Sequence, residues 1–112
     1  MQVKDIMVSI PVKCKVEQTL GEVAHLFLLY GVDGLPVLDG EDNFVGYIDK
    51  KQLFTAIAND LDSKTHVHKI MVSNLMSVAP ETDLKDLYNL TDRMMPVIKG
   101  RKFLGLVTRK AI

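Results

Sequence analysis

The sequence contains two closely similar copies of one pattern. The segment VKDIMVS at residues 3–9 returns as VHKIMVS at residues 67–73. Each copy continues through an amphipathic stretch and a Pro-Val pair, and closes on an apolar run around one glycine, FVGYID at 44–49 and FLGLVT at 103–108. Self-similarity at a long period indicates a duplicated supersecondary unit. Functional residues are therefore to be sought in pairs of corresponding positions rather than in one linear motif.

Length and composition favour one compact domain. The 112 residues are 47% apolar, which is enough to build a core. No apolar run approaches the length of a membrane span, and the MQVKD start lacks the apolar segment of a signal peptide, so we expect a cytoplasmic domain without membrane insertion. Cys14 is the single cysteine and alternates with Val12 and Val16, which predicts a small core residue.

Charge is divided unequally between the copies, although the net charge is zero. Residues 1–56 hold eight acids and five bases, whereas residues 57–112 hold six acids and nine bases. The basic tail at 93–110 allows two interpretations, a local anion site or a solvated surface that complements the acidic copy. Nucleic-acid binding is disfavoured, because it requires many phosphate contacts on a basic face.

The first copy predicts the element order strand, helix, strand, strand, helix. Residues 11–16 alternate like a half-buried strand, and segments 35–38 and 44–48 flank the turn DGEDN. Thr19 with Glu22 and Asp49 with Gln52 form two capping-box signatures, each of which predicts a helix start. The expected apolar faces are Leu20, Val23, Ala24, Phe27 and Leu28 in a helix that ends near Gly31, and Leu53, Phe54, Ile57 and Ala58 in the next.

The second copy repeats this order with a shorter helix. Eight residues separate Leu87 from Pro96, where twelve separate Val23 from Pro36, and a loss of four is close to one helical turn. We expect repeats at 3–58 and 67–112 with a linker at 59–66. After Thr108 the pattern predicts a final helix that is truncated at Ile112, with further protein C-terminal to it.

These features resemble a tandem pair of CBS domains, also called a Bateman module. The resemblance rests on the order of elements, the DIM-type opening of each copy, the LPV and MPV contexts and the glycine-centred closing strand, and it covers residues 3 to about 112. It implies an α/β (α+β) fold of two βαββα repeats packed about a pseudo-twofold axis, with the final helix of the second repeat truncated. In that family, ligands bind in clefts between the repeats.

The same resemblance implies a non-catalytic regulatory module rather than an enzyme. Family members commonly sense adenosine-containing ligands, usually form homodimers and control an attached effector. We expect an adenine nucleotide or an S-adenosyl compound as regulatory ligand, no required cofactor, and an effector domain C-terminal to Ile112. The alternative is a dimerisation module with degenerate, ligand-free clefts. No hydrolase, P-loop or zinc-protease motif is present in the sequence.

The family's ligand signature is an apolar residue, Pro and another apolar residue that grip the base, followed by a glycine-led stretch whose Ser/Thr lies near phosphate and whose Asp receives ribose hydroxyls. In the first copy, 35–37 match the gripping segment, but Asp49 replaces the Ser/Thr and Gln52 replaces the Asp. A carboxylate caps a helix well but repels a phosphate. This copy is therefore not expected to hold a phosphate at this end, although Gln52 or Asp49 can still bond a sugar.

In the second copy, the gripping segment 95–97 and Thr108 are kept, and Arg109 follows directly. A hydroxyl, backbone donors and positive charge together suit an anion. Ala111 stands at the ribose-binding position, which argues against standard AMP recognition. The predicted ligand-binding residues are Met95, Pro96, Val97, Thr108, Arg109, Leu35, Pro36, Val37, Asp49, Gln52, Ile10 and Pro11.

Two further groups of residues have side chains that can bind a ligand or a metal. His66 and His68 alternate as a pair of metal ligands would, but they lie in the linker without a third ligand nearby, so no metal site is expected. Met94 and Met95 flank the expected cleft and offer an adaptable apolar surface, whereas Met71 is expected to fill the core.

Overall fold

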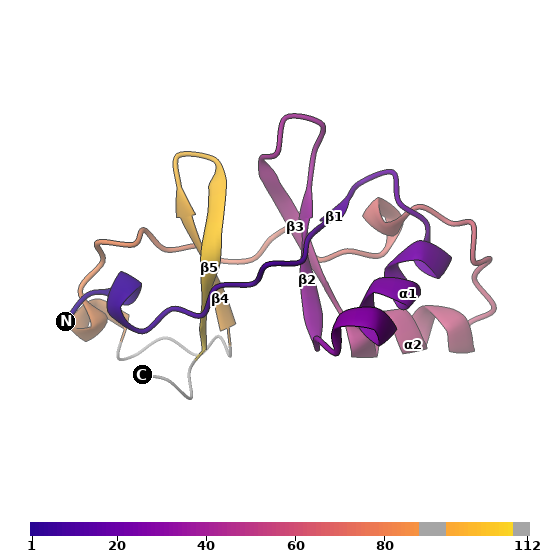
Figure 1. Ribbon diagram of the computed structural model, residues 1–112, viewed down its shortest axis with the longest axis horizontal. Helices are drawn as coiled ribbons and strands as arrows, with labels where there is room; N and C mark the ends of the chain where they lie inside the picture. Colours follow the sequence, from indigo (N-terminus) through magenta and orange to yellow (C-terminus); the bar gives the residue numbers. More distant parts are fainter. Residues whose placement is uncertain (88–93, 109–112) are drawn as a thin grey trace. The chain divides into compact units, whose positions relative to one another are not determined.

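A computed structural model describes residues 1–87 and 94–108. The chain divides into two compact units (Figure 1). The first-copy unit comprises Val12–Asn74, and the second-copy unit comprises Met1–Pro11 together with Leu75–Ile112. The units do not coincide with the two sequence copies. The opening segment of the first copy, residues 3–9, belongs to the second-copy unit, and the opening segment of the second copy, residues 67–73, belongs to the first-copy unit.

The first-copy unit contains a three-stranded sheet in the order β1-β2-β3. Strand β1 (Cys14–Lys15) pairs parallel with β2 (Gly34–Leu38), which pairs antiparallel with β3 (Phe44–Asp49). The predicted strand at 11–16 is thus shorter than expected, and its alternation of exposed and buried residues holds from Pro11 to Cys14, after which Lys15 and Val16 are both half-buried. The β2–β3 turn is stabilised by Asp39, whose Oδ1 accepts the backbone N–H groups of Glu41 and Asn43 at 2.8 and 2.9 Å.

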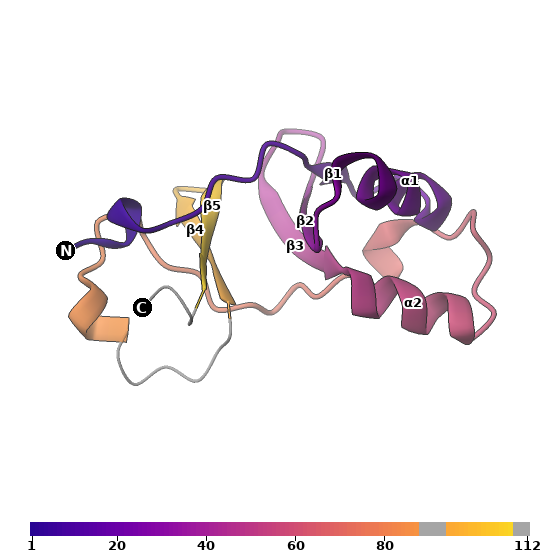
Figure 2. The ribbon, with the colours of Figure 1, turned by 60° about the horizontal axis from the view of Figure 1, so that its bottom comes forward.

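Two helices complete this unit, and both begin where the capping boxes predict. Helix α1 (Leu20–Tyr30) is capped by Thr19 and ends at Gly31, which adopts a φ of 63°. Helix α2 (Lys50–Ala58) is capped by Asp49. The short 3-10 turn η2 (Val67–Lys69) follows. Figures 1 and 2 both show α1 and α2 on the same side of the sheet.

The core of the first-copy unit lies between the sheet and these helices. Leu35 and Val37 of β2 and Ile48 of β3 are fully buried against apolar side chains of α1 and α2. Each such aliphatic side chain contributes about 1.5–3 kcal/mol by leaving water. The buried members of the core are Val12, Cys14, Leu20, Val23, Phe27, Leu35, Val37, Ile48, Leu53, Ala56 and Val67.

Part of the predicted apolar face of each helix is wrong. Leu28, Phe54 and Ile57 are 85%, 62% and 54% exposed, and Ala58 is exposed as well. In α2 the buried positions are Leu53 and Ala56, three residues apart. Phe54 and Ile57 are each one residue further, about 100° around a helix of 3.6 residues per turn. Spacing alone could not distinguish these two adjacent stripes.

The second-copy unit is built on one antiparallel strand pair, β4 (Met94–Lys99) with β5 (Lys102–Thr108). Val78 adds a parallel bridge to Val97, as β1 does to β2. Two 3-10 turns, η1 (Val3–Asp5) and η3 (Leu84–Leu87), contribute to its core. The buried core residues are Val3, Leu87, Met95, Val97 and Val107. The rest of the predicted short helix and the predicted truncated final helix fall on 88–93 and 109–112, outside the described residues.

In each unit, the opening segment of the other copy pairs with the last strand, which is β3 in the first-copy unit and β5 in the second-copy unit. In the first-copy unit, Val72 and Tyr47 exchange backbone hydrogen bonds of 2.8 and 2.9 Å, and in the second-copy unit Val8 and Leu106 do the same at 2.7 and 2.9 Å. This close approach explains the glycine in each closing strand. A Cβ on Gly46 would lie 2.5 Å from Met71 Sδ, and one on Gly105 would lie 2.6 Å from the Val8 carbonyl oxygen.

Among the described residues, no helix combines the length and apolar character needed to cross a bilayer.

Candidate functional site

The two strand pairs have the same register, which identifies corresponding positions in the two copies. Pro36 pairs with Tyr47 as Pro96 pairs with Leu106. At the strand ends, Gly34 faces Asp49 in the first-copy unit, and Met94 faces Thr108 in the second. Asp49 and Thr108 therefore occupy equivalent positions, as the sequence predicts.

Asp49 acts as a helix cap at the first of these strand ends. Its Oδ1 accepts the Gln52 backbone N–H at 2.8 Å, and Gln52 Oε1 accepts the Asp49 backbone N–H at 2.8 Å. The carboxylate therefore satisfies a donor at the positive end of α2. A bound anion would have to compete with this charge for the same helix end.

Tyr47 adds a buried phenol to this strand end, which the sequence reasoning missed. It is 8% exposed, and its ring lies against Gly34, where a Cβ would overlap the ring. Burial, followed by the nearby charges of Asp49 and Asp33, raises the pKa of Tyr47 to about 12. Because strand side chains alternate, Tyr47 shares a face with Asp49 two residues later, and this spacing could have identified it.

The predicted base-gripping side chains lie within the cores of their own units. Leu35 and Val37 are 0% exposed, and Met95 and Val97 are 1% and 0% exposed. Pro36 and Pro96 are also buried. The Cys14 thiol lies 3.6 Å from the Pro36 carbonyl oxygen, and burial raises the thiol pKa to about 12. All six residues therefore have a packing role in the described structure.

The remaining predicted residues divide between the units. Gln52 is half-buried in the first-copy unit, together with Asp49 and residues 35–37. Thr108 and Ile10 are half-buried and Pro11 is exposed in the second-copy unit, which also contains residues 95–97. Arg109 falls outside the described residues. The predicted residues that the structure describes are thus divided into two sets, one in each unit.

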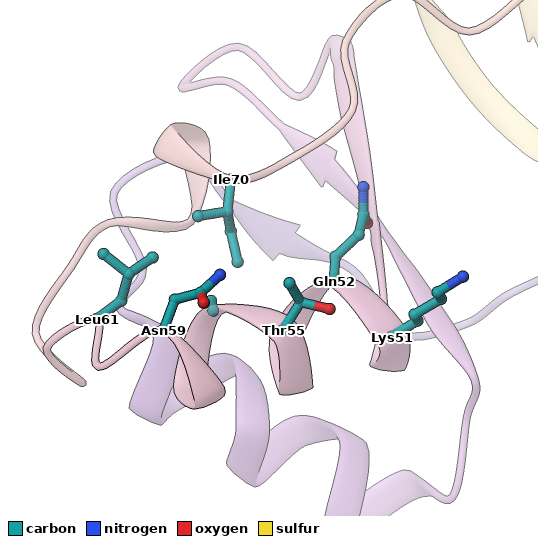
Figure 3. A pocket seen from close by; sticks show the side chains of 7 residues that line it. Lys51, Gln52, Thr55, Asn59, Leu61 and Ile70 are labelled. Carbon is teal, nitrogen blue, oxygen red and sulfur yellow. The ribbon is translucent and has the colours of Figure 1, made fainter.

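A cavity of about 330 Å³ lies along α2 in the first-copy unit. Figure 3 shows six of its seven lining residues with labels. Of the predicted site residues, only Gln52 contributes to it. The other lining residues were not predicted, because polar groups on a helix surface give no distinctive sequence signal and Leu61 and Ile70 come from beyond α2. The lining residues are Lys51, Gln52, Thr55, Ala56, Asn59, Leu61 and Ile70.

His66 and His68 lie close together at η2, where His66 precedes the turn and His68 is part of it. The ring centroids of His66 and His68 are 5.7 Å apart. Within 1–87 and 94–108, no group of three or more His, Cys, Asp or Glu side chains could hold a metal ion.

Curated proteins with similar sequences are much longer than this chain. An A-adding tRNA nucleotidyltransferase of Geobacter sulfurreducens is 26% identical over 94% of this chain and 12% of its own length. An inosine-5'-monophosphate dehydrogenase of Methanocaldococcus jannaschii is 27% identical over 98% of this chain and 21% of its own length. The chain thus spans about an eighth to a fifth of these relatives.

Several solved structures share the fold. A putative acetoin utilization protein, AcuB, from Vibrio cholerae matches with a TM-score of 0.85 and 23% identity over 99% of this chain and 87% of that one. CBSX2 in complex with AMP matches with a TM-score of 0.81 and 24% identity, over 98% of this chain and 91% of that one. The CBS domain pair of MJ0100, in complex with 5'-methylthioadenosine and S-adenosyl-L-methionine, matches with a TM-score of 0.80 and 22% identity, over 99% of this chain and 91% of that one.

The family models agree with the duplication seen in the sequence. The CBS domain model matches twice, at residues 3–59 and 67–112, and so covers nearly all of the chain. Together with the shared fold, these matches mean that the chain belongs to the CBS domain family and carries two CBS domains in tandem.

Proposed function

We propose that this chain is a non-catalytic regulatory module that senses a small adenosine-containing ligand and controls an attached effector domain. The observation that carries the proposal is the difference between two equivalent strand ends, where Asp49 is a helix cap and Thr108 offers a hydroxyl. Two structurally similar proteins were solved with adenosine-containing ligands, CBSX2 with AMP and MJ0100 with S-adenosyl-L-methionine, and this supports an adenosine-containing ligand. The greater length of the curated relatives supports an attached effector.

The second-copy strand end is the proposed anion site. Thr108 is half-buried at the end of β5, and Arg109 and Lys110 follow in the sequence. A hydroxyl beside two cations can hold a phosphate or carboxylate through charge-assisted hydrogen bonds. The first-copy strand end is proposed to bind only uncharged parts of a ligand, because Asp49 places a carboxylate there.

Regulation requires that the ligand bind one arrangement of the module more tightly than another. We propose that AMP, ATP or S-adenosylmethionine raises the melting temperature of the chain, with the response depending on Thr108. Thermal denaturation with each compound at millimolar concentration tests this, and Asp86→Asn, a change in an exposed 3-10 turn, serves as the control. The absence of any response across the three compounds would remove the proposal.

A second proposed role is homodimerisation, which the exposed apolar side chains of α1 and α2 favour. These are Leu28, Leu29, Tyr30, Phe54 and Ile57, each more than half exposed. Side chains of this kind on adjoining helices mark an interaction surface when they gather together. Light scattering should give the mass of a dimer, and Phe54→Asp should give a monomer. A wild-type chain that is monomeric at high concentration would contradict this role.

A further inference from the structure

The second-copy unit is assembled from two separate parts of the chain. One part is Met1–Pro11 and the other is Leu75–Ile112, and the whole of Val12–Asn74 lies between them in the sequence. The first-copy unit, by contrast, is one continuous stretch. Residues 1–8 of the second-copy unit therefore contact the rest of that unit as a separate segment, much as one chain contacts another.

Backbone hydrogen bonds hold this segment in place. The Val3 N–H donates to the Thr82 carbonyl oxygen at 2.9 Å. The Leu84 N–H donates to the Met1 carbonyl oxygen at 3.0 Å. Val8 pairs with β5, and Figures 1 and 2 both show the N-terminal segment beside that strand. Backbone bonds of this kind join an added strand to a sheet whichever chain supplies the strand.

The first-copy unit makes the corresponding contacts with the second copy of the segment. The Val67 N–H donates to the Gln18 carbonyl oxygen at 2.8 Å, and the Leu20 N–H donates to the Thr65 carbonyl oxygen at 2.9 Å. Both segments insert a valine that is 0% exposed, Val3 in one unit and Val67 in the other. The segment and its receiving surface are thus a matched pair that occurs twice in the chain, and recognition between them rests on the backbone and one buried valine.

Ser9, Ile10 and Pro11 connect residues 1–8 to the first-copy unit. Among the residues that the structure describes, these three form no hydrogen bond, and Ser9 and Pro11 are exposed. The proline ring fixes its own φ and keeps the preceding residue extended. A short and stiff connection favours exchange between copies, because it limits the ways in which the segment can return to its own unit.

We propose that residues 1–8 are exchanged between two copies of this chain, so that the segment of each copy completes the second-copy unit of the other. Val3 then fills the core of the partner's unit, and Val8 pairs with the partner's Leu106. Reciprocal exchange closes the assembly as a twofold dimer and regains every contact that opening breaks. The balance between the closed and exchanged forms is therefore set by chain concentration. This inference is independent of the proposed ligand and uses a surface other than α1 and α2.

The experiment mixes two variants of the full chain, Val8→Cys and Leu106→Cys, each in a Cys14→Ala background, at millimolar concentration before mild oxidation. Exchange places the two cysteines on directly opposite residues of different copies, where Cα atoms about 5.5 Å apart allow a disulfide. Peptide mass spectrometry should detect this disulfide between the two variants, in a yield that rises with chain concentration. The matched control replaces Leu106→Cys by Arg101→Cys, in the exposed turn between β4 and β5, and should give no disulfide above random collision.

The possible failures are distinguishable. In dilute solution, the double variant Val8→Cys/Leu106→Cys should form the disulfide within one copy. If it does so and the mixture forms none between copies, the exchange is overturned while the proposed ligand sensing stands, whether or not the chain dimerises through α1 and α2. Should a variant lose its native spectrum, or the double variant form no disulfide, mixed ¹⁵N- and ¹³C-labelled wild-type chains decide. A nuclear Overhauser effect between the Val8 amide of one label and Leu106 of the other supports the exchange, and its absence overturns it.

Discussion

The two units pair their strands in the same register, but they carry different side chains at the corresponding positions. In the first-copy unit the register positions hold Cys14, Tyr47 and Asp49, all of which can ionise. The equivalent positions of the second-copy unit hold Val78, Leu106 and Thr108, none of which ionises near neutral pH. Duplication has therefore kept the backbone pairing while the side chains diverged. The comparison predicts that pH, backbone crowding, ligands and capping affect the two units unequally.

The largest expected difference is in alkaline stability. Burial raises the pKa of Cys14 from 9.0 to about 12 and is the main cause that raises the pKa of Tyr47 from 10.0 to about 12. A group whose pKa is raised on folding stabilises the protein below its unfolded pKa, and this stability is lost as pH rises towards the folded value. Each unit of pKa difference corresponds to about 1.4 kcal/mol.

We therefore expect the first-copy unit to lose stability between pH 9.0 and about 12, before the second-copy unit does. Amide exchange measured across this range would report each unit separately. The double change Cys14→Ala and Tyr47→Phe should remove most of the slope, and Tyr30→Phe, on an exposed tyrosine, is the control. Equal alkaline loss in both units would contradict the assignment.

Backbone crowding should be the next largest difference. Gly105→Ala places a Cβ 2.6 Å from a backbone oxygen, whereas Gly46→Ala meets the flexible end of Met71. Because the thioether can move and the backbone cannot, we expect losses in free energy of unfolding of about 3 and about 1 kcal/mol respectively. Urea denaturation of the two variants measures this. Gly40→Ala, where a Cβ has open space, is the control. Equal losses at Gly46 and Gly105 would contradict the view that Met71 can move aside while the Val8 backbone cannot.

Helix capping should give the smallest effects. Asp49→Ala and Thr19→Ala each remove the side-chain acceptor of a capping box and should cost about 1 kcal/mol in urea denaturation. Asp49→Asn keeps an acceptor and should cost only a few tenths of a kcal/mol. A loss as large for Asn as for Ala would show that the charge of Asp49, rather than its capping bond, stabilises α2.

The sequence predicted the elements of the first copy well because their signals are local. The capping boxes at Thr19 and Asp49, the left-handed end at Gly31 and the alternation around Cys14 each depend on residues within one turn or one strand. The tandem CBS fold was also predicted correctly, because the same local signals occur twice in the same order.

The sequence did not predict features that depend on contacts between distant residues. The exposure of Leu28, Phe54 and Ile57 is set by how each helix is rotated against the sheet, and adjacent apolar stripes on one helix look alike in sequence. The exchange of opening segments brings Val8 to Leu106 and Val72 to Tyr47, pairings that no local pattern encodes. The α2 cavity combines Ile70 with residues of a preceding helix for the same reason.

The measurement that tests the central claim most directly is AMP binding by calorimetry to the wild type and to two variants at the equivalent strand ends. Thr108→Val keeps the shape but removes the hydroxyl, and it should weaken binding roughly tenfold. Asp49→Asn removes the charge but keeps the cap, and it should leave binding equal or tighter. If Thr108→Val binds AMP as tightly as the wild type does, the assignment of the anion site to the second copy is contradicted.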